Sequence, residues 1–240
     1  MMKTSLISLA ATLIAGPALA ATINVSSFSN SGYNTAVGSM GHAVSQDFET
    51  YGEGNVDAGF ATNVGTFWSL GGTGSGGTVT NAGFANDGSL LAIRDGNVYG
   101  RTSSTSELTS NSDDDMFLDS NDTFGMIWNV SLGADRMFDR IVFTVTDAAE
   151  FGGSLWIGTN GATTTVMNAA NAVRNLIEIT FDQSMSSATV VLSHFNGSGN
   201  FTNDGFSIDD IAVSEVPLPA SALLLLGGLG GLAAMRRRKA

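Results

Sequence analysis

The chain has 240 residues with 22 Asp and Glu against ten Lys and Arg, and it has no cysteine, which excludes disulfide bonds, thiolate metal sites and cysteine nucleophiles. Residues 21–215 hold all 22 acidic residues and five arginines but no lysine, a net charge of −17, so nucleic acid and anionic lipid are poor partners for this part. Thirty glycines among many Ser, Thr and Asn predict many turns and few long helices.

Residues 1–20 have the pattern of a secretory signal peptide. Lys3 supplies a positive n-region, residues 6–15 an apolar h-region, and Ala18-Leu19-Ala20 an A-x-A cleavage site. We therefore expect the cell's export machinery to take up the chain and a signal peptidase to cut between Ala20 and Ala21. The mature protein then starts near Ala21.

Residues 21–215 show short apolar runs or period-2 alternation between turn residues, which predicts one extracytoplasmic all-β domain, a jelly-roll-like antiparallel β-sandwich. No interior stretch keeps a helical period for long, and the best helix candidate, 167–176, is rich in Asn. The expected strands are 45–50, 65–70, 89–95, 123–130, 139–147, 153–158, 175–181, 187–194 and 206–213.

Two segments have the composition of surface loops rather than of ligand-binding sites. The glycine-rich stretch 71–78 is not followed by Lys and does not lie in an α/β pattern, so it predicts a hairpin tip rather than a phosphate-binding loop. The polar segment 102–122 predicts a surface excursion that Phe117, Leu118 and Phe124 fasten to the core. Its acidic residues form either a cation site or a solvated acidic loop: Asp113, Asp114, Asp115, Asp119 and Asp122.

Acidic motifs at the two ends of the domain are candidates for a metal site. Asp47-Phe48-Glu49 lies in the first expected strand and Asp209-Asp210 in the last, and these strands commonly lie side by side in a jelly roll. Glu49 with Asp209 or Asp210 and backbone carbonyls would give the oxygen ligands that Ca²⁺ prefers. In a regular strand the two aspartates face opposite sides, so only one could serve. Alternatively, these carboxylates cap strand ends or pair with an arginine.

Catalysis finds little support, and we expect no enzyme. His42 and His194 are the only histidines, and Ser193 and His194, as neighbours on a strand, face opposite sides, which does not suit a nucleophile and its base. A polysaccharide-cleaving enzyme with two catalytic carboxylates is an alternative, because acidic residues are plentiful.

Binding of a glycan would use exposed aromatic side chains. Trp68, Trp128 and Trp156 are the candidates for such contacts in a carbohydrate-binding module. Each lies among apolar strand residues, so packing in the core is the alternative for each of them.

Residues 216–240 combine three features in order. The motif Val216-Pro217-Leu218-Pro219-Ala220 is followed by an apolar run over 220–235, which is about 24 Å long as a helix, and then by four cations. The cations are expected on the cytoplasmic side of a membrane, which leaves the domain outside. They are Arg236, Arg237, Arg238 and Lys239.

This tail resembles the PEP-CTERM class of sorting signals, in its VPLPA variant. The resemblance implies a Gram-negative bacterium, transient tethering to the inner membrane, and cleavage near Val216–Ala220 by an exosortase-type transpeptidase. It also implies a place at the cell surface or in a biofilm matrix, in association with extracellular polysaccharide. A shorter resemblance, of the motifs DFE at 47–49 and IDDI at 208–211, is to MAM-type jelly rolls, although the chain lacks the cysteines of that family.

Overall fold

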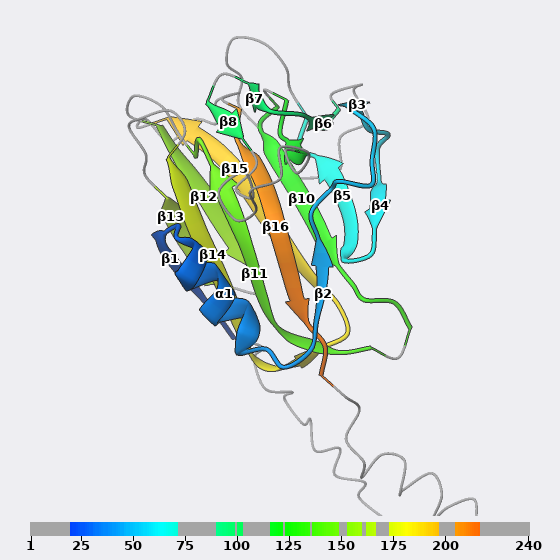
Figure 1. Ribbon diagram of the computed structural model, residues 1–240, viewed down its shortest axis with the longest axis vertical. Helices are drawn as coiled ribbons and strands as arrows, with labels where there is room; N and C mark the ends of the chain where they lie inside the picture. The colour runs from blue at the N-terminus through cyan, green and yellow to red at the C-terminus, as the bar shows by residue number, and fades with distance from the viewer. Residues whose placement is uncertain are drawn as a thin grey trace, which may run out of the picture.

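The structure, a computed structural model, describes residues 20–71, 90–98, 100–102, 116–121, 123–134, 136–148, 153–159, 162–166, 173–196 and 205–216. These residues form an all-β sandwich of two antiparallel sheets with one short helix on the outside (Figure 1). The expected fold class is therefore confirmed at the level of an all-β sandwich.

The larger sheet, called sheet A, contains the first and last described strands. Its order is β1-β14-β11-β16-β9-β6-β3, and β2 also pairs with β16. The strands are β1 (Ala21–Ser27), β14 (Arg174–Met185), β11 (Phe138–Thr146), β16 (Ser207–Ser214), β9 (Phe117–Asp119), β6 (Ala92–Arg94), β3 (Gly54–Asn55) and β2 (Ala43–Gln46).

The second sheet, called sheet B, covers the inner face of sheet A. Its order is β13-β12-β15-β10-β5-β4, and a separate hairpin joins β7 to β8. The strands are β13 (Ala162–Val166), β12 (Gly153–Thr159), β15 (Ala188–Asn196), β10 (Gly125–Val130), β5 (Gly65–Ser69), β4 (Phe60–Thr62), β7 (Asn97–Val98) and β8 (Arg101–Thr102).

The core lies between the sheets, where three aromatic rings meet. Phe67 and Trp128 of sheet B are stacked with ring centroids 5.3 Å apart, and Trp128 meets Phe143 of sheet A edge-on at 5.9 Å. All three are fully buried, and Trp128 Nε1 donates a hydrogen bond to the carbonyl oxygen of Val64 at 3.1 Å. Trp128 is therefore a core residue with its one donor satisfied, which is the alternative that the sequence left open.

The helix α1 (Asn30–Gly38) lies on the outer face of sheet A, next to β11 and β14 (Figure 1). Its sequence is rich in Asn, Gly and Thr, so its stability comes from outside the helix. Ser29 caps it by accepting a hydrogen bond from the Gly32 amide at 3.1 Å. One apolar face then packs on the sheet, through Tyr33, Ala36 and Val37 against Val142 and Leu176, and Met40, just after the helix, joins this cluster.

Each of the nine expected strands overlaps an observed one. The short helix α1 was not predicted, because it depends on its cap and on sheet A rather than on a long periodic pattern. The expected strand 45–50 ends early, since Phe48 has a left-handed φ of 63°. The weak helix candidate 167–176 ends in β14, and its residues 167–172 lie outside the described ranges.

Candidate functional site

The two acidic motifs meet beside β16. β2 pairs with the second half of β16, with Gln46 opposite Ile211, whereas β9 pairs with its beginning, with Leu118 opposite Ile208. Asp209 and Asp210 therefore lie where one partner strand gives way to the other. We call this place the carboxylate junction, made of residues 47–49 and 209–210.

A β-bulge changes the direction of the two aspartates. β11 pairs Val142 with Ala212 and Thr144 with Asp209, so one β11 residue stands opposite two residues of β16. Asp210 takes a left-handed φ of 49°. Because Ile208 and Ile211 both belong to the core, Asp209 and Asp210 both lie toward the outer face of sheet A. The expectation of opposite faces was wrong, since it assumed a regular strand.

The negative charge of this junction affects the pKa of Tyr33 in α1. Burial raises the pKa of Tyr33, and the carboxylates of Asp210, Asp209 and Asp47 raise the pKa further. The hydroxyl therefore stays protonated at neutral pH. Asp209 and Asp210 are buried, whereas Asp47 is exposed at the rim, so the junction opens to solvent through Asp47.

Glu49 is positioned by the residue that precedes β9. Its Oε1 accepts a hydrogen bond from the backbone amide of Met116 at 2.8 Å, next to β9. Within the described ranges, no three His, Asp or Glu side chains are grouped closely enough to hold a metal ion. A calcium ion at the junction would therefore need backbone carbonyl oxygens besides the carboxylates, which is ordinary for this cation.

Asp119, in the segment predicted as a surface excursion, is a buried structural residue. Its carboxylate lies 3.3 Å from Arg101 Nε and 3.8 Å from Arg94 Nε, and it accepts a hydrogen bond from the Asn121 amide at 2.8 Å. Arg94 also donates to Asn121 Oδ1 at 3.0 Å. The interpretation as a solvated acidic loop was therefore wrong for Asp119. Asp113, Asp114, Asp115 and Asp122 lie outside the described residues.

His194 and the neighbouring Ser193 do not form a catalytic pair. His194 is buried in the core, where its Nε2 is hydrogen-bonded to the carbonyl oxygen of Ala148 and its ring meets Phe206 at 4.9 Å. Ser193 precedes it on β15 and points to the opposite face. His42 is exposed in the turn before β2.

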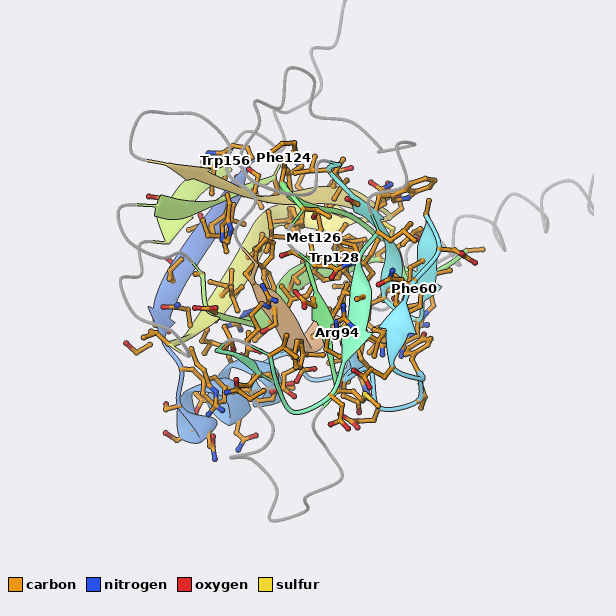
Figure 2. All side chains as sticks on the ribbon, turned by 90° about the horizontal axis from the view of Figure 1, so that it is seen from above. Phe60, Arg94, Phe124, Met126, Trp128 and Trp156 are labelled. Atoms are coloured by element: carbon orange, nitrogen blue, oxygen red, sulfur yellow. The ribbon has the colours of Figure 1, made fainter. Side chains whose placement is uncertain are left out.

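Two of the three tryptophans lie on the outer face of sheet B. Trp68 follows the inward Phe67 on β5, and Trp156 lies between the core residues Leu155 and Ile157 on β12, so both point outward. Both are partly exposed, in contrast to Trp128. Figure 2 shows Trp128 among the side chains of the core and Trp156 at the periphery.

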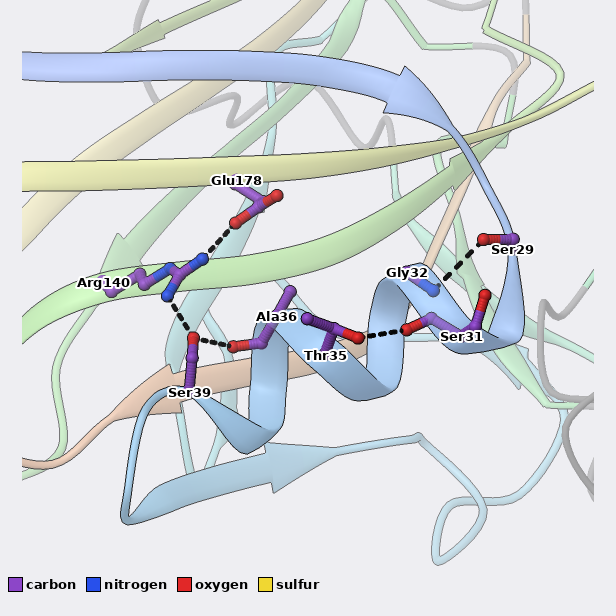
Figure 3. A pocket seen from close by; sticks show the side chains of 8 residues that line it. All are labelled: Ser29, Ser31, Gly32, Thr35, Ala36, Ser39, Arg140 and Glu178. Carbon is purple, nitrogen blue, oxygen red and sulfur yellow. Dashed lines mark hydrogen bonds and ion pairs between the residues drawn. The ribbon is translucent and has the colours of Figure 1, made fainter.

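A polar hollow of about 360 Å³ lies between α1 and sheet A (Figure 3). Hydroxyl groups of Ser29, Ser31, Thr35 and Ser39 line one side, and Arg140 and Glu178 the other. Arg140 donates hydrogen bonds to Ser39 Oγ and to Glu178 Oε2, so its charge is balanced within the hollow. This hollow could not be predicted from the sequence, because it depends on helix α1, which was not predicted.

Backbone hydrogen bonds join the residues beside both predicted processing sites to the sheets. The carbonyl oxygen of Ala20 accepts a hydrogen bond from the Asp182 amide at 3.1 Å, and β1 starts at Ala21. At the other end, the Val216 amide donates to the Met137 carbonyl at 2.8 Å. Residues 1–19 and 217–240, including most of the sorting motif and the four terminal cations, lie outside the described residues.

No family model matches the chain, and no curated protein matches it. Among solved structures, an arabinose-bound GH51 α-L-arabinofuranosidase is similar at 12% identity and a TM-score of 0.31, over 52% of this chain. The match spans 22% of that enzyme's chain. In the described part of the chain, no helix is long and apolar enough to cross a membrane, and the predicted segment 220–235 lies outside that part.

Proposed function

We propose that this chain is an exported protein of the cell surface or extracellular matrix of a Gram-negative bacterium, with a non-enzymatic, structural or adhesive role among secreted polysaccharide. The export machinery removes residues 1–20, and residues 220–235 then hold the chain in the inner membrane with the cations in the cytoplasm. An exosortase-type transpeptidase cuts within Val216–Ala220 and releases the domain. A jelly-roll-like topology of the sandwich is part of this proposal.

The observation that carries the proposal is the position of the residues next to the two predicted cleavage sites. Ala21 lies opposite Phe181 on β14, Thr180 lies opposite Arg140 on β11, and the Arg140 amide donates to Ser214 Oγ at 2.9 Å. Ala21 and Val216 therefore lie at the same end of sheet A, the lower end in Figure 1. Cuts at both predicted sites leave every described strand intact. While the tail holds the domain at the membrane, the opposite end of sheet A points away from the membrane.

The test is the intact mass of the protein recovered from its own cells, with membrane and medium fractions measured separately. We expect a species that starts at Ala21 and ends within residues 216–220. A variant with Pro217→Ala and Pro219→Ala should keep its tail and remain in the membrane. Pro17→Ala changes a proline of the signal peptide instead, and it is the control that shows the effect of altered export alone. A wild-type protein that retains Arg236–Lys239, or that starts at Met1, would contradict the proposal.

We also propose that calcium binds at the carboxylate junction and stabilises the fold. The observation in favour is the bulge, which brings Asp209 and Asp210 to one face near Asp47. Calcium should raise the melting temperature of the wild type, because an ion bound only by the folded state stabilises it by about 2.7 kcal/mol at one hundred times its Kd. Asp210→Asn should abolish the increase, and Asp182→Asn, at an exposed position of β14, should preserve it. Coincident wild-type melting curves with calcium and with a chelator would rule the site out.

A further inference from the structure

We propose that the protein forms a dimer in which strand β1 of one copy pairs antiparallel with β1 of a second copy. β1 lies at the margin of sheet A (Figure 1), and among the described residues it is hydrogen-bonded to β14 alone, so its other side is an open edge. β13, at the edge of sheet B, lies near β1 but pairs with β12. β1 contains no Lys, Pro or bulge, which are features by which edge strands avoid such pairing.

The backbone of β1 has outward hydrogen-bonding groups at every second residue. On either side of β1, the Asp182 amide donates to the Ala20 carbonyl at 3.1 Å, and the Phe28 amide donates to the Arg174 carbonyl at 3.1 Å. In an antiparallel pair, residues bonded to the neighbouring strand alternate with residues whose amide and carbonyl point the other way. The even-numbered residues of β1 are therefore bonded to β14. The odd-numbered residues direct their amide and carbonyl groups to the open edge, and they are Ala21, Ile23, Val25 and Ser27.

This open edge is complementary to itself. A two-fold axis through Asn24 places Ile23 opposite Val25 of the second copy, and Ala21 then lies opposite Ser27 of the second copy. Outward groups meet outward groups along the whole strand, and each pair exchanges hydrogen bonds in both directions. Ile23 and Val25 pack against the core but are only partly buried at this edge. Across the axis they become neighbours, so the pairing buries more of their apolar surface and adds a cross-strand contact.

The charge distribution allows two copies to meet at this edge. Residues 21–215 carry a net charge of −17, so two copies repel each other over most of their surface. Residues 20–46, which include β1, α1 and β2, contain no Asp, Glu, Lys or Arg. At the centre of β1, Asn24 lies opposite Glu178 of β14, and Arg140 donates a hydrogen bond to the Glu178 carboxylate. Because both copies use the same strand, the contact closes at two chains and does not continue into a fibre.

The first experiment is cysteine cross-linking of the protein purified from its own cells, because the chain has no cysteine of its own. Asn24→Cys places two thiols opposite each other on the axis, in a non-hydrogen-bonded pair with Cα atoms about 4.5 Å apart, which a disulfide can span. Thr22→Cys is the matched control at another exposed residue of β1. Thr22 lies opposite Ser26 of the second copy, so its two thiols would be about 14 Å apart. We expect mild oxidation to convert N24C, but not T22C, into a covalent dimer.

Charges on the axis test the dimer without a disulfide. In gel filtration with light scattering, the wild type should have the mass of two chains. Asn24→Lys and Asn24→Asp should each raise the Kd of the dimer about tenfold or more, because like charges then lie directly opposite each other. A mixture of N24K and N24D should dimerise again, since opposite charges now meet. Thr189→Lys, at an exposed position of sheet B, is the control and should not weaken the dimer.

A wild type that stays monomeric up to its solubility limit would overturn the inference. So would a dimer that N24K and N24D leave unchanged, or equal cross-linking of T22C and N24C, because the contact would then use another surface or another register. Asn24 is exposed, so the melting temperatures of its variants should stay close to that of the wild type, which separates loss of the dimer from unfolding. These measurements concern the folded domain, so failure of the inference leaves the proposed function untouched.

Discussion

Asp119 is fully buried, yet a carboxylate is retained there because two guanidinium groups lie against it. The side chain of Arg101 is 7% exposed and that of Arg94 is 29% exposed. Burying the carboxylate alone would be costly, but the two guanidinium groups balance its charge, and the ion pairs connect β9, β6 and β8. At the scale of the single residue, this cluster stabilises one end of sheet A.

Replacement of Asp119 by Asn should destabilise the fold by about 3–5 kcal/mol, because it leaves the buried Arg101 without this countercharge. The measurement is the urea unfolding midpoint. Glu215→Gln is the matched control, because Arg136 donates hydrogen bonds to both carboxylate oxygens of Glu215. This pair is exposed, so the loss of stability should be much smaller. An Asp119→Asn variant as stable as Glu215→Gln would contradict the structural role.

Tyr33 gives a prediction for alkaline pH. Its pKa is raised in the folded protein, so the folded state favours the protonated phenol. The stabilisation is present below the pKa of an unfolded tyrosine, about 10, and is lost as the pH rises above it. Tyr33→Phe should therefore lose less stability than the wild type between about pH 9 and 11. Parallel thermal unfolding curves across this range would show that Tyr33 does not contribute.

At the scale of the element, α1 and the bulge of β16 show how tertiary contacts determine local structure. α1 packs its apolar face on Val142 and Leu176 and lines one side of the polar hollow, although its own residues are weak helix formers. The bulge lies where β2 and β9 meet along β16, and it brings two adjacent aspartates to the same face. Both features combine segments that are far apart in the sequence.

The cap of α1 can be tested with two serines on the same hollow. Ser29→Ala removes the acceptor for the Gly32 amide and should cost about 1 kcal/mol of stability. Ser31→Ala changes a neighbouring exposed hydroxyl and should have little effect. Chemical denaturation of both variants is the measurement, and equal stabilities would show that the cap does not contribute.

At the scale of the whole molecule, the sandwich is closed by its last strand. β16 is hydrogen-bonded to β11 on one side and to β2 and β9 on the other, so it lies inside sheet A rather than at its edge. The chain leaves the sheet directly afterwards, at Val216, where the predicted sorting motif begins. The folded domain and the predicted tail therefore meet without a long linker.

This arrangement predicts different results for two truncations. A chain that ends at Val216 should melt within a few degrees of the full-length mature protein, because all described strands are retained. A chain that ends at Phe206 loses β16 and should fail to fold, since β11, β2 and β9 each lose a neighbouring strand. Circular dichroism on heating distinguishes the two, and a cooperative transition in the shorter chain would contradict the central role of β16.

The alternation of apolar residues was sufficient to predict the class of fold and nine of the strands, because period-2 patterning depends only on which side of a strand is buried. β1 was missed, although Ile23 and Val25 alternate with polar residues and offered a signal. The very short strands had too few residues to show any period. The strand that leads into the first acidic motif does pair with the last strand, as β2 with β16, but the expected direction of one aspartate was wrong because of the bulge.

The sequence by itself determined the acidic, cysteine-free composition, the class of fold, and the predicted signals at both ends, since these depend on residue type and local spacing alone. Only the tertiary structure decided that Trp128 is buried while Trp68 and Trp156 lie outside, that Asp119 is neutralised by two arginines, and that α1 forms. The physical reason is that burial, charge pairing and a bulge depend on which strands become neighbours. That choice is made by contacts between residues far apart in the chain.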